Sequence, residues 1–366
     1  MRLSWVELRE YRNHQHTRVD LRTDGLFVVA GSNGEGKTNL LEAMHFLYAL
    51  GSPRVSASAP LVREGAGSAY VRGEFETRDG RSLVEVEIRR KGANRVQVDR
   101  SAVRRRRDLR RSVRVVLFGP FDLPVVTADP SRRRGFMDEA VVLLQPSRDT
   151  LTTAYERVLR QRNRLLREHD GRGAPKDLEA WDDQLVTTGS AVMGARAEAV
   201  EAIARPASIA FQHVCGYGLV VAYAPNVAGG GEAEDAFRAQ LAERRADELV
   251  RRTSLVGPHR DELDLAVRDL GARSFASHGE TWVAALAIRL GIASAVQEAI
   301  GEPPILVVDD PYSALDPSRR DRIAKMLADR EGQVVISVAD EADIPPRAAA
   351  IFDVRGGSVT RREETA

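Results

Sequence analysis

A glycine-rich segment near the N-terminus constrains the fold of this 366-residue chain more than any other feature. It has the sequence GSNGEGKT, from Gly31 to Thr38, and matches the pattern G-x-x-x-x-G-K-[ST] of phosphate-binding loops. The apolar run LFVVA before it predicts a strand, and the pattern after it predicts a helix. In such a loop, backbone N–H groups converge on phosphate oxygens at the positive end of a helix. The alternative, a tight glycine turn that only caps the helix, is disfavoured by this context.

Two side chains of the loop have distinct expected roles. Lys37 is one of only four lysines in the chain, and we expect its ammonium group to bridge the β- and γ-phosphates of a nucleotide. We expect the hydroxyl of Thr38 to hold Mg²⁺. The candidate nucleotide-binding residues are Gly31, Ser32, Asn33, Gly34, Glu35, Gly36, Lys37, Thr38 and Asn39.

A phosphate-binding loop needs an acidic partner, because a metal must be anchored and a water oriented toward the terminal phosphate. The segment PPILVVDDPYSALD provides an apolar strand at 305–308 followed by two aspartates. We expect Asp309 to hold Mg²⁺, and Asp310 and Lys37 to be catalytic, with Asp310 orienting or deprotonating the water. A strand that ends in a polar turn is the plain alternative. An earlier candidate, VVLFGPFD, is interrupted by glycine and proline before its aspartate and is disfavoured.

The long separation between loop and acidic strand excludes the compact arrangement of small GTPases and nucleotide kinases. Strand-like patterns dominate residues 1–100, and helical periodicity replaces them from residue 131 to residue 214. The turn DGRGAPKD within that region predicts an antiparallel helical hairpin, with Asp177 capping its second helix. We therefore predict an α/β head built from residues 1–130 plus 215–366, with a helical insertion lobe at 131–214.

A second candidate anion site precedes the acidic strand. The segment FASHGETWVAALAIRL places Ser277 and Gly279 at the start of a long apolar helix. The N-terminus of a helix attracts anions, although alone this pattern is more often an ordinary capped helix. Its position just before the acidic strand strengthens the prediction.

Arginine is concentrated between residues 100 and 114, where eight positions are arginine and Asp108 is the only acid. Such a cluster predicts salt-dependent contacts with phosphate backbones, and its lack of aromatic residues favours duplex or junction DNA over single strands. A solvated basic face, or a surface for an acidic partner, has equal weight. The candidate DNA-binding residues are Arg104, Arg105, Arg106, Arg107, Arg110 and Arg111.

Composition indicates the cellular compartment and limits the kinds of partner. The single cysteine, Cys215, cannot close a disulfide within the chain, which favours a reducing compartment such as the cytoplasm. No uncharged apolar run is long enough to span a bilayer, so we predict no membrane contact. Because the net charge is +1, attraction to a polyanion must come from local patches.

Taken in order, these segments resemble the RecF family, a branch of the ATP-binding-cassette (ABC) superfamily that is related to structural-maintenance-of-chromosomes (SMC) heads. The resemblance runs nearly end to end, through RLSWVELREYRNH, GSNGEGKTNLLEAMHFL, VVLFGPFDL, DPSRRRGFMD, LVGPHRDELDL, FASHGE and ILVVDDPYSALD. It implies an ABC-type P-loop ATPase head, SMC-like, with a short helical insertion and no long coiled coil. It also implies slow, DNA-stimulated ATP hydrolysis with Mg²⁺ in recombinational repair and replication restart. The implied partners are gapped or junction duplex DNA, and RecO and RecR, which help to load RecA.

The resemblance further implies an ATP-dependent homodimer with two ATP molecules between its subunits. Ser277, Gly279 and Glu280 match the signature segment, which contacts the γ-phosphate of the ATP held by the other subunit. Asp316 matches the loop that crosses this interface.

The chain departs from the usual pattern at several positions. Glu280 stands where the signature usually has glutamine, and its charge near a triphosphate is expected to slow turnover or shift the helix. Asp122 occupies the region of a glutamine found in transporters, and Ser337 or Asp340 that of their histidine. Two alternative functions stay open. Sheet-rich and helical content permits the nucleotide-binding subunit of an ABC transporter, although the missing histidine and the helical hairpin argue against it. Glu280 and Asp310 suggest the other, an SMC-like structural DNA-binding module with vestigial hydrolysis.

Three other matches to the family have less certain roles. Tyr11, Arg12 and Asn13 are candidates for contact with the nucleotide base or α-phosphate. Arg133 and Arg134 are candidates for the nucleotide, the interface or DNA. The segment GPHRDEL matches the family but has no evident chemistry.

Overall fold

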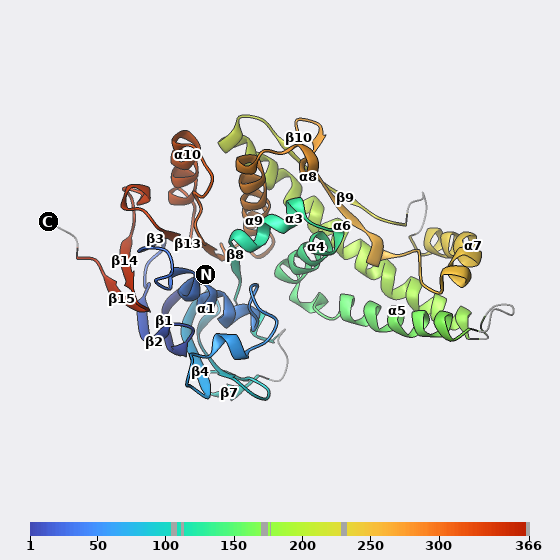
Figure 1. Ribbon diagram of the computed structural model, residues 1–366, viewed down its shortest axis with the longest axis horizontal. Coiled ribbons are helices and arrows are strands. Elements are labelled where there is room, and N and C mark those ends of the chain that lie inside the picture. Colours follow the sequence, from blue (N-terminus) through green and yellow to red (C-terminus); the bar gives the residue numbers. More distant parts are fainter. Residues whose placement is uncertain (104–107, 111–112, 170–174, 176, 228–232, 364–366) are drawn as a thin grey trace.

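A computed structural model describes residues 1–103, 108–110, 113–169, 175, 177–227 and 233–363. The molecule has a β-rich head, which contains both chain ends, and a helical arm that extends from it (Figure 1). The arm carries α5 (Leu151–Glu168), the first half of α6 (Leu178–Cys215) and α7 (Ala233–Arg251).

The two ends of the chain build one six-stranded sheet of order β15-β14-β3-β13-β12-β8. Pairing is parallel from β14 to β8, and only β15 is antiparallel. Parallel strands end at the same edge, so the loop after β3 meets the aspartates after β12 there, with β13 between them. The strands are β3 (Gly25–Ala30), β8 (Val115–Phe118), β12 (Ile305–Val308), β13 (Gln333–Val338), β14 (Ala350–Arg355) and β15 (Ser358–Arg361).

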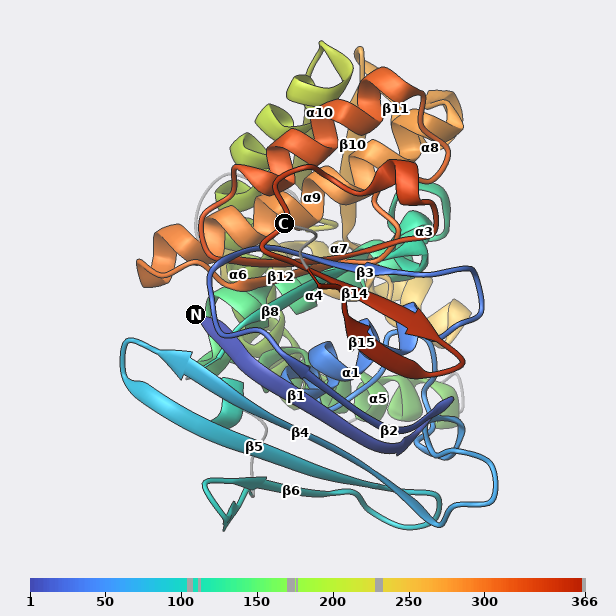
Figure 2. The same cartoon turned by 90° about the vertical axis from the view of Figure 1, so that its left-hand side faces the viewer.

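A second, antiparallel sheet has the order β2-β1-β4-β5-β6-β7 and faces the first across α1 (Lys37–Ala49) (Figure 2). Helix α1 contacts strands of both sheets, and its residues from Leu40 to Tyr48 are all buried. The helix that follows the P-loop is thereby fixed on two sides. The strands are β1 (Arg2–Tyr11), β2 (His14–Asp20), β4 (Ser68–Thr77), β5 (Gly80–Arg89), β6 (Arg95–Val98) and β7 (Ser101–Ala102).

Helices α4 (Pro130–Leu144) and α9 (His278–Ile300) and the second half of α6 pack together beside the head sheet. A three-stranded sheet of β9 (Leu219–Ala224), β10 (Glu262–Val267) and β11 (Leu270–Gly271) lies against α6. The remaining elements are η1 (Ala59–Leu61), η2 (Pro120–Asp122), α3 (Leu123–Thr127), η3 (Pro146–Arg148), η4 (Pro258–Arg260), α8 (Ala272–Phe275), α10 (Pro317–Ala328) and η5 (Glu341–Asp343).

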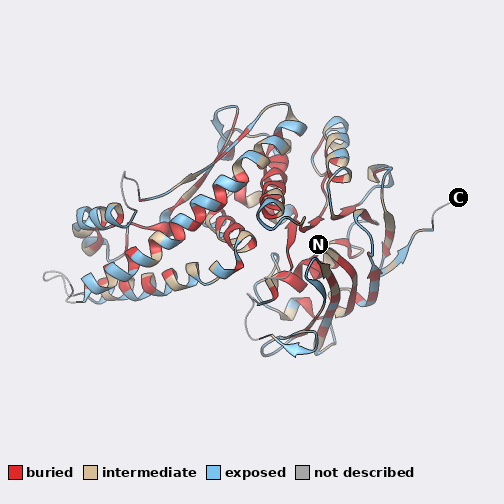
Figure 3. Ribbon diagram, turned by 180° about the vertical axis from the view of Figure 1, so that it is seen from behind, coloured by how far each residue is buried: buried red, intermediate tan, exposed pale blue. Residues whose placement is uncertain are grey.

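Helix α9 is the central helix of this packing. By length and composition alone it could cross a membrane, but 72% of its most apolar stretch is buried inside the protein. Buried residues run from the head sheets into the packing of α4, α9 and the second half of α6 (Figure 3), and α9 contributes to that shared core. Its apolar character is accounted for by its place in a protein interior.

Helices α5 and α6 form a hairpin, and α7 packs on it. The sequence-based boundaries put α7 in the head, because it follows β9 in the chain. In the structure Phe237 and Leu241 of α7 are buried with Tyr155 and Leu185 in a separate small core, so α7 lies with the arm. Asp177 stands at the N-cap position of α6, but its side chain makes no capping hydrogen bond.

A buried ionic network holds the arm together. Arg162 is fully buried; its Nε donates to Asp182 at 2.8 Å and its Nη2 donates to Glu248 at 2.6 Å. Its Nη1 donates to the hydroxyl of Ser254 at 2.7 Å. One guanidinium therefore joins all three arm segments.

Replacing Arg162 by alanine is expected to lower the free energy of unfolding by about 3–5 kcal/mol, because the buried Glu248 loses its counter-charge. Urea unfolding followed by circular dichroism measures the loss. Arg164→Ala is the matched control on the same helix, because Arg164 is 67% exposed and, among the described residues, pairs with Glu168 on the surface. We expect that control to change the free energy by less than about 0.5 kcal/mol. Equal effects of the two variants would contradict the role of the network.

Candidate nucleotide-binding site

The P-loop adopts a conformation that needs its glycines. Gly31 has φ 152° and Gly36 has φ 118°, both in the left-handed half of φ space that disfavours other residues. A side-chain carbon on Gly31 would lie 2.4 Å from the carbonyl oxygen of Val354. The Lys37 ammonium donates to the carbonyl oxygens of Gly31 at 2.5 Å and Ser32 at 2.9 Å. The loop is thus curled around its own lysine.

Burial lowers the pKa of Lys37, and the nearby carboxylates of Asp309 and Asp310 oppose that shift. The side chain stays cationic at neutral pH, since an ordinary lysine titrates far above it. A desolvated cation within a ring of backbone N–H groups favours a polyanionic ligand.

Opposite the lysine, three side chains from different parts of the chain meet. The hydroxyl of Thr38 donates to Asp309 Oδ1 at 3.0 Å, and the hydroxyl of Ser337 donates to the same atom at 2.7 Å. These oxygens fit Mg²⁺, which takes one or two protein ligands and completes its shell with water and phosphate. Within the described residues there is no cluster of three or more His, Cys, Asp or Glu side chains suited to a metal.

Asp310 lies in a left-handed turn directly after β12. Its φ is 52°, a left-handed conformation that is uncommon outside glycine, asparagine and aspartate. Its backbone N–H donates to the hydroxyl of Ser337 at 2.9 Å, which fixes the turn. Burial and the neighbouring charge of Asp309 raise the pKa of Asp310. A carboxylate of raised pKa is a better proton acceptor for a water.

Ser337 is the residue that sequence analysis left undecided with Asp340. It lies on β13, fully buried between the two aspartates. Asp340 is exposed and instead caps η5 through the N–H of Ala342. Of the two candidates, Ser337 is therefore the one that contacts both aspartates of the site.

Asp122 does not reach this site. It is buried after β8 and accepts from Nη2 of Arg289 on α9 at 2.6 Å. Burial raises the pKa of Asp122, and the charge of Arg289 opposes the shift. The loop that lines the pocket through Pro120 is thus joined by an ion pair to the helix that begins at Ser277.

Residues of the N-terminal segment RLSWVELREYRNH form hydrogen bonds with the P-loop. The Asn13 amide donates to the Glu35 carbonyl at 2.8 Å and accepts from Asn39 at 2.8 Å. His14 Nε2 lies 3.0 Å from the Gly36 carbonyl and must be the donor, because a carbonyl only accepts.

Arg12, in the same block, makes a two-point contact with Glu42 at 2.9 and 3.0 Å, and Tyr11 is fully buried. The expected contacts of these two residues with the nucleotide base or α-phosphate are replaced by contacts within the protein.

Ser277 is the N-cap of α9 and is exposed. Its Oγ accepts from the N–H of Glu280 at 3.3 Å, and its own N–H donates to the Glu280 carboxylate at 2.8 Å. The first turn of α9 is therefore exposed at Ser277, and binding of an anion there stays a prediction.

Glu280 lies differently from the expectation. Its side chain is 2% exposed and turned inward, where Tyr217 and Arg268 donate to one of its oxygens. Burial raises its pKa, but the hydrogen bonds from Tyr217 and Ser277 and the charge of Arg268 outweigh burial and hold the pKa at about 2. Its negative charge is compensated by these donors, and one of its carboxylate oxygens accepts from the backbone N–H of Ser277.

Two consecutive arginines, Arg319 and Arg320, follow Asp316, and their side chains contact different segments. Asp316 caps α10 by accepting from the N–H of Arg319 at 3.1 Å. The guanidinium of Arg319 lies against the signature segment, 3.1 Å from where a side-chain carbon on Gly279 would be. Arg320 instead donates to Asp343 at 3.0 Å. Sequence analysis missed Arg319; its only signal was the pair of arginines just after SALD.

The signature segment does not line the nucleotide pocket of its own chain. That pocket has a volume of about 400 Å³, and no residue of α9 is among its described lining residues. The lining residues are Asn33, Gly34, Gly36, Lys37, Thr38, Asn39, Arg54, Pro120, Asp309, Asp310, Ser337 and Ala339.

The structure describes only part of the predicted arginine cluster. Arg104 to Arg107 and Arg111 lie outside the described residues. Arg110 donates to the Ala49 carbonyl at 3.3 Å and stands over the ring of Tyr48. Arg114 is buried and donates to the Leu143 carbonyl at 2.7 Å. These two arginines hold protein segments together.

Arg133 and Arg134 bind the GPHRDEL segment. Arg133 makes a two-point contact with Glu262, and Arg134 donates to the Asp261 carbonyl at 3.1 Å. The carboxylate of the fully buried Asp261 accepts from Arg196 at 3.0 Å and from Tyr223 at 2.5 Å. The segment is therefore a junction that ties α4, α6 and β9 to the start of β10.

Comparison with known proteins agrees with this geometry. A family model described as RecF/RecN/SMC N terminal domain matches residues 2–353. DNA replication and repair protein RecF of Streptomyces avermitilis is 38% identical over 99% of this chain and 100% of its own length. The same protein of Cutibacterium acnes is 38% identical over 98% of both chains.

Solved structures show the same fold. The recombination mediator protein RecF with ATP, of the RecFOR pathway, superposes with a TM-score of 0.87 at 24% identity, covering 99% of this chain and 97% of that one. An SMC head bound to the C-winged helix domain of ScpA has a TM-score of 0.59 at 16% identity, covering 100% and 98%. The chain is thus similar to SMC-type ATPase heads, without a long coiled coil.

Proposed function

The chain belongs to the RecF family of DNA replication and repair proteins, and we propose that ATP joins two copies of it on DNA and that hydrolysis separates them. The family and the SMC-type head make it an ATP-binding protein of DNA repair. Slow ATP hydrolysis and the dimer are the proposed parts. The setting we propose is the cytoplasm, with RecO and RecR as partners on gapped or junction duplex DNA.

One observation supports the proposed dimer. The nucleotide pocket contains the P-loop and both aspartates, while the predicted anion-binding surface formed by Ser277, Gly279 and Arg319 lies elsewhere on the chain. Each copy therefore lacks this signature surface at its own pocket, and a second copy can supply it. ATP held by one copy would then be completed by the signature surface of the other.

Within each pocket we assign roles from the contacts above. Lys37 and the P-loop N–H groups bind the β- and γ-phosphates. Thr38 and Asp309 would hold Mg²⁺, which when bound neutralises charge on the phosphates. Asp310 accepts the proton of the attacking water, and Ser337 keeps both aspartates in position.

The alternatives are less well supported. Relatives at 38% identity over the full chain are RecF proteins, which does not favour a transporter subunit. Vestigial hydrolysis was suggested by Glu280, whose charge is compensated inside the protein.

We expect the protein to be a monomer without nucleotide and a dimer with ATP and Mg²⁺. Sedimentation velocity measures the change, and Lys37→Ala is the control that should stay monomeric because its loop loses the phosphate-binding cation. A protein that stays monomeric in saturating ATP would contradict the proposal.

Replacing Arg319 by glutamine is expected to lower turnover by about tenfold or more, because a guanidinium beside the signature surface stabilises charge on a transferring phosphoryl group. Phosphate release measures turnover. Lys325→Gln removes a charge from the same helix, α10, where Lys325 is 69% exposed and pairs with Asp321, and should have little effect. If both variants lose the same activity, the effect of Arg319 is general electrostatics and not a contact with phosphate.

A further inference from the structure

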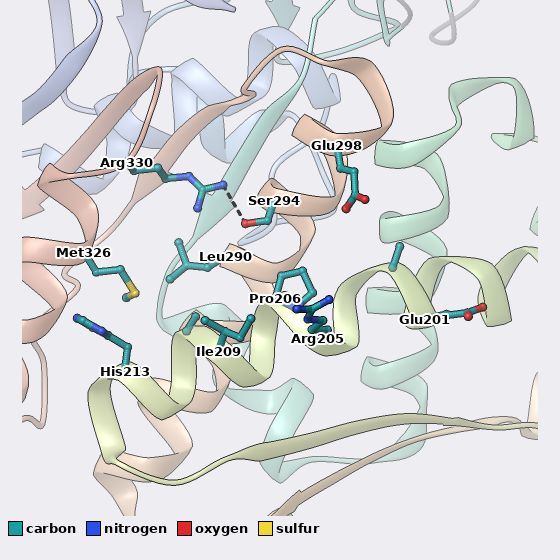
Figure 4. Close-up of a pocket in the computed structure, with 12 residues that line it drawn as sticks. Glu201, Arg205, Pro206, Ile209, His213, Leu290, Ser294, Glu298, Met326 and Arg330 are labelled. Carbon is teal, nitrogen blue, oxygen red and sulfur yellow. Dashed lines mark hydrogen bonds between the residues drawn. The ribbon is translucent and has the colours of Figure 1, made fainter.

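A groove runs along α6 on the side where it meets the C-terminal half of α9. One part of it, of about 650 Å³, is lined by α6, α9 and the end of α10 (Figure 4). A second part, of about 300 Å³, continues between α4, α6 and α9, and the two parts share Ala202 and Glu298. We call this feature the α6–α9 groove.

The groove has an apolar floor. Leu290 is buried at its base, Met326 lies at one end, and Ile209 is 56% exposed although it is a large apolar side chain. Pro206 lies in the middle of α6 and has no N–H, so the carbonyl of Ala202 lacks its helical partner and borders the groove. Glu201, Arg205 and Glu298 also line the groove, which therefore offers apolar contacts, a backbone acceptor and charged side chains of both signs.

A cation without a carboxylate partner lies in the same place. Among the described residues, the guanidinium of Arg330 has one hydrogen-bond partner, the hydroxyl of Ser294 at a marginal 3.5 Å (Figure 4). Arg12, by contrast, makes a two-point contact with the carboxylate of Glu42. Burial lowers the pKa of Arg330, but an arginine stays charged, so its desolvation is not compensated within the chain.

The groove would stay open in the dimer proposed above. Ser277 and Asp316, at the N-termini of α9 and α10, face the second copy in that proposal. Leu290 lies about 20 Å further along α9, at 1.5 Å per residue, and Arg330 follows the opposite end of α10. A partner seated in the groove therefore does not compete with ATP.

From these contacts we infer that the α6–α9 groove is a docking site for an acidic, apolar peptide segment of another protein. The carboxylate of the segment forms a two-point contact with Arg330, and its large apolar side chains pack on Leu290, Ile209 and Met326. Guanidinium and carboxylate match in this geometry, and a peptide in an apolar groove gains most from a few anchors.

Fluorescence anisotropy with labelled peptides tests the inference. The probes are Asp-Asp-Glu followed by Leu-Ile-Phe, Phe-Leu-Ile or Ile-Phe-Leu, and the controls replace the acids by Asn-Asn-Gln or Lys-Lys-Arg. We expect at least one acidic probe to bind the full-length protein, with and without ATP, at least about tenfold more tightly than its amide control. Arg330→Gln should remove that preference, and Ile209→Asp should weaken binding of the same peptide.

A charge exchange makes the test specific. Arg330→Glu is expected to bind the basic peptide better than the acidic one, while Arg347→Gln, at an arginine that is 83% exposed elsewhere, should behave as wild type. Unchanged ATP-driven dimerisation of each variant shows that the head is folded. The inference is overturned if no acidic probe binds, if Arg330→Glu keeps the acidic preference, or if Ile209→Asp prevents dimerisation, which would identify a second copy as the occupant.

Discussion

Replacing Asp310 by asparagine is expected to lower ATP turnover by about 10²–10⁴-fold while leaving ATP-driven dimerisation intact. Asparagine keeps the shape of the side chain and tolerates the left-handed backbone at φ 52°, so the turn after β12 should be preserved. It cannot accept a proton from water. Phosphate release measures turnover, and sedimentation velocity with ATP and Mg²⁺ shows a dimer that persists longer than that of the wild type.

Two further observations separate this role from a structural one. Asp340→Asn is the control, because Asp340 is an exposed capping residue outside the pocket, and its turnover should stay close to wild type. Burial and Asp309 raise the pKa of Asp310, and only its deprotonated form accepts a proton. Wild-type turnover should therefore fall with decreasing pH at a value above the ordinary aspartate pKa of 3.8, and Asp310→Asn should lack that dependence. Full turnover in Asp310→Asn would exclude the proposed base.

The central part of the site was predictable because it depends on short motifs and one rule of topology. Lys37 and Thr38 belong to a loop whose glycines permit the positive φ angles that a phosphate-binding turn needs. Asp309 follows an apolar strand, and parallel strands bring such strand ends to one edge. A motif and a strand pattern were therefore enough to bring Thr38 and Asp309 together, 271 positions apart in the chain, at 3.0 Å.

The neighbours of that centre were not predictable, because they depend on which side chains face each other in the folded protein. Ser337 and Asp340 were equal candidates in the sequence, and only the register of β13 beside β12 places Ser337 between the aspartates. Arg319 was hidden among fifty arginines, 54 basic residues less four lysines, until α10 placed it beside Gly279.

Charge patterns were the least reliable guide. Glu280 is an added negative charge in the sequence, but Tyr217 and Arg268 approach it from segments that no local pattern connects. Arg114 belongs to a basic run, yet it is buried and binds backbone carbonyls. Burial decides whether a charge serves a ligand or the fold, and short sequence patterns do not determine burial for polar residues.

Mixing two inactive variants is expected to restore turnover if the signature surface acts on the other copy's ATP. Lys37→Ala removes the phosphate-binding cation, and Ser277→Arg blocks the first turn of α9 with a large side chain; each alone should lose about 10²-fold or more. Lys37→Ala stays monomeric alone and Ser277→Arg blocks its own facing surface, so the dimers that ATP joins are mixed ones, and each has one intact composite site of two. Turnover should therefore recover to at most about half of the wild-type value.

A second mixture provides the matched control for this result. Lys37→Ala and Asp310→Asn both damage the pocket side, so each composite site of their mixed dimer contains one defect and the mixture should stay inactive. Recovery in the first mixture but not in the second places Ser277 and Lys37 on opposite copies around one ATP. If the first mixture stays as inactive as the second, the separation of α9 from the nucleotide pocket has another explanation, and the ATP-joined dimer is wrong.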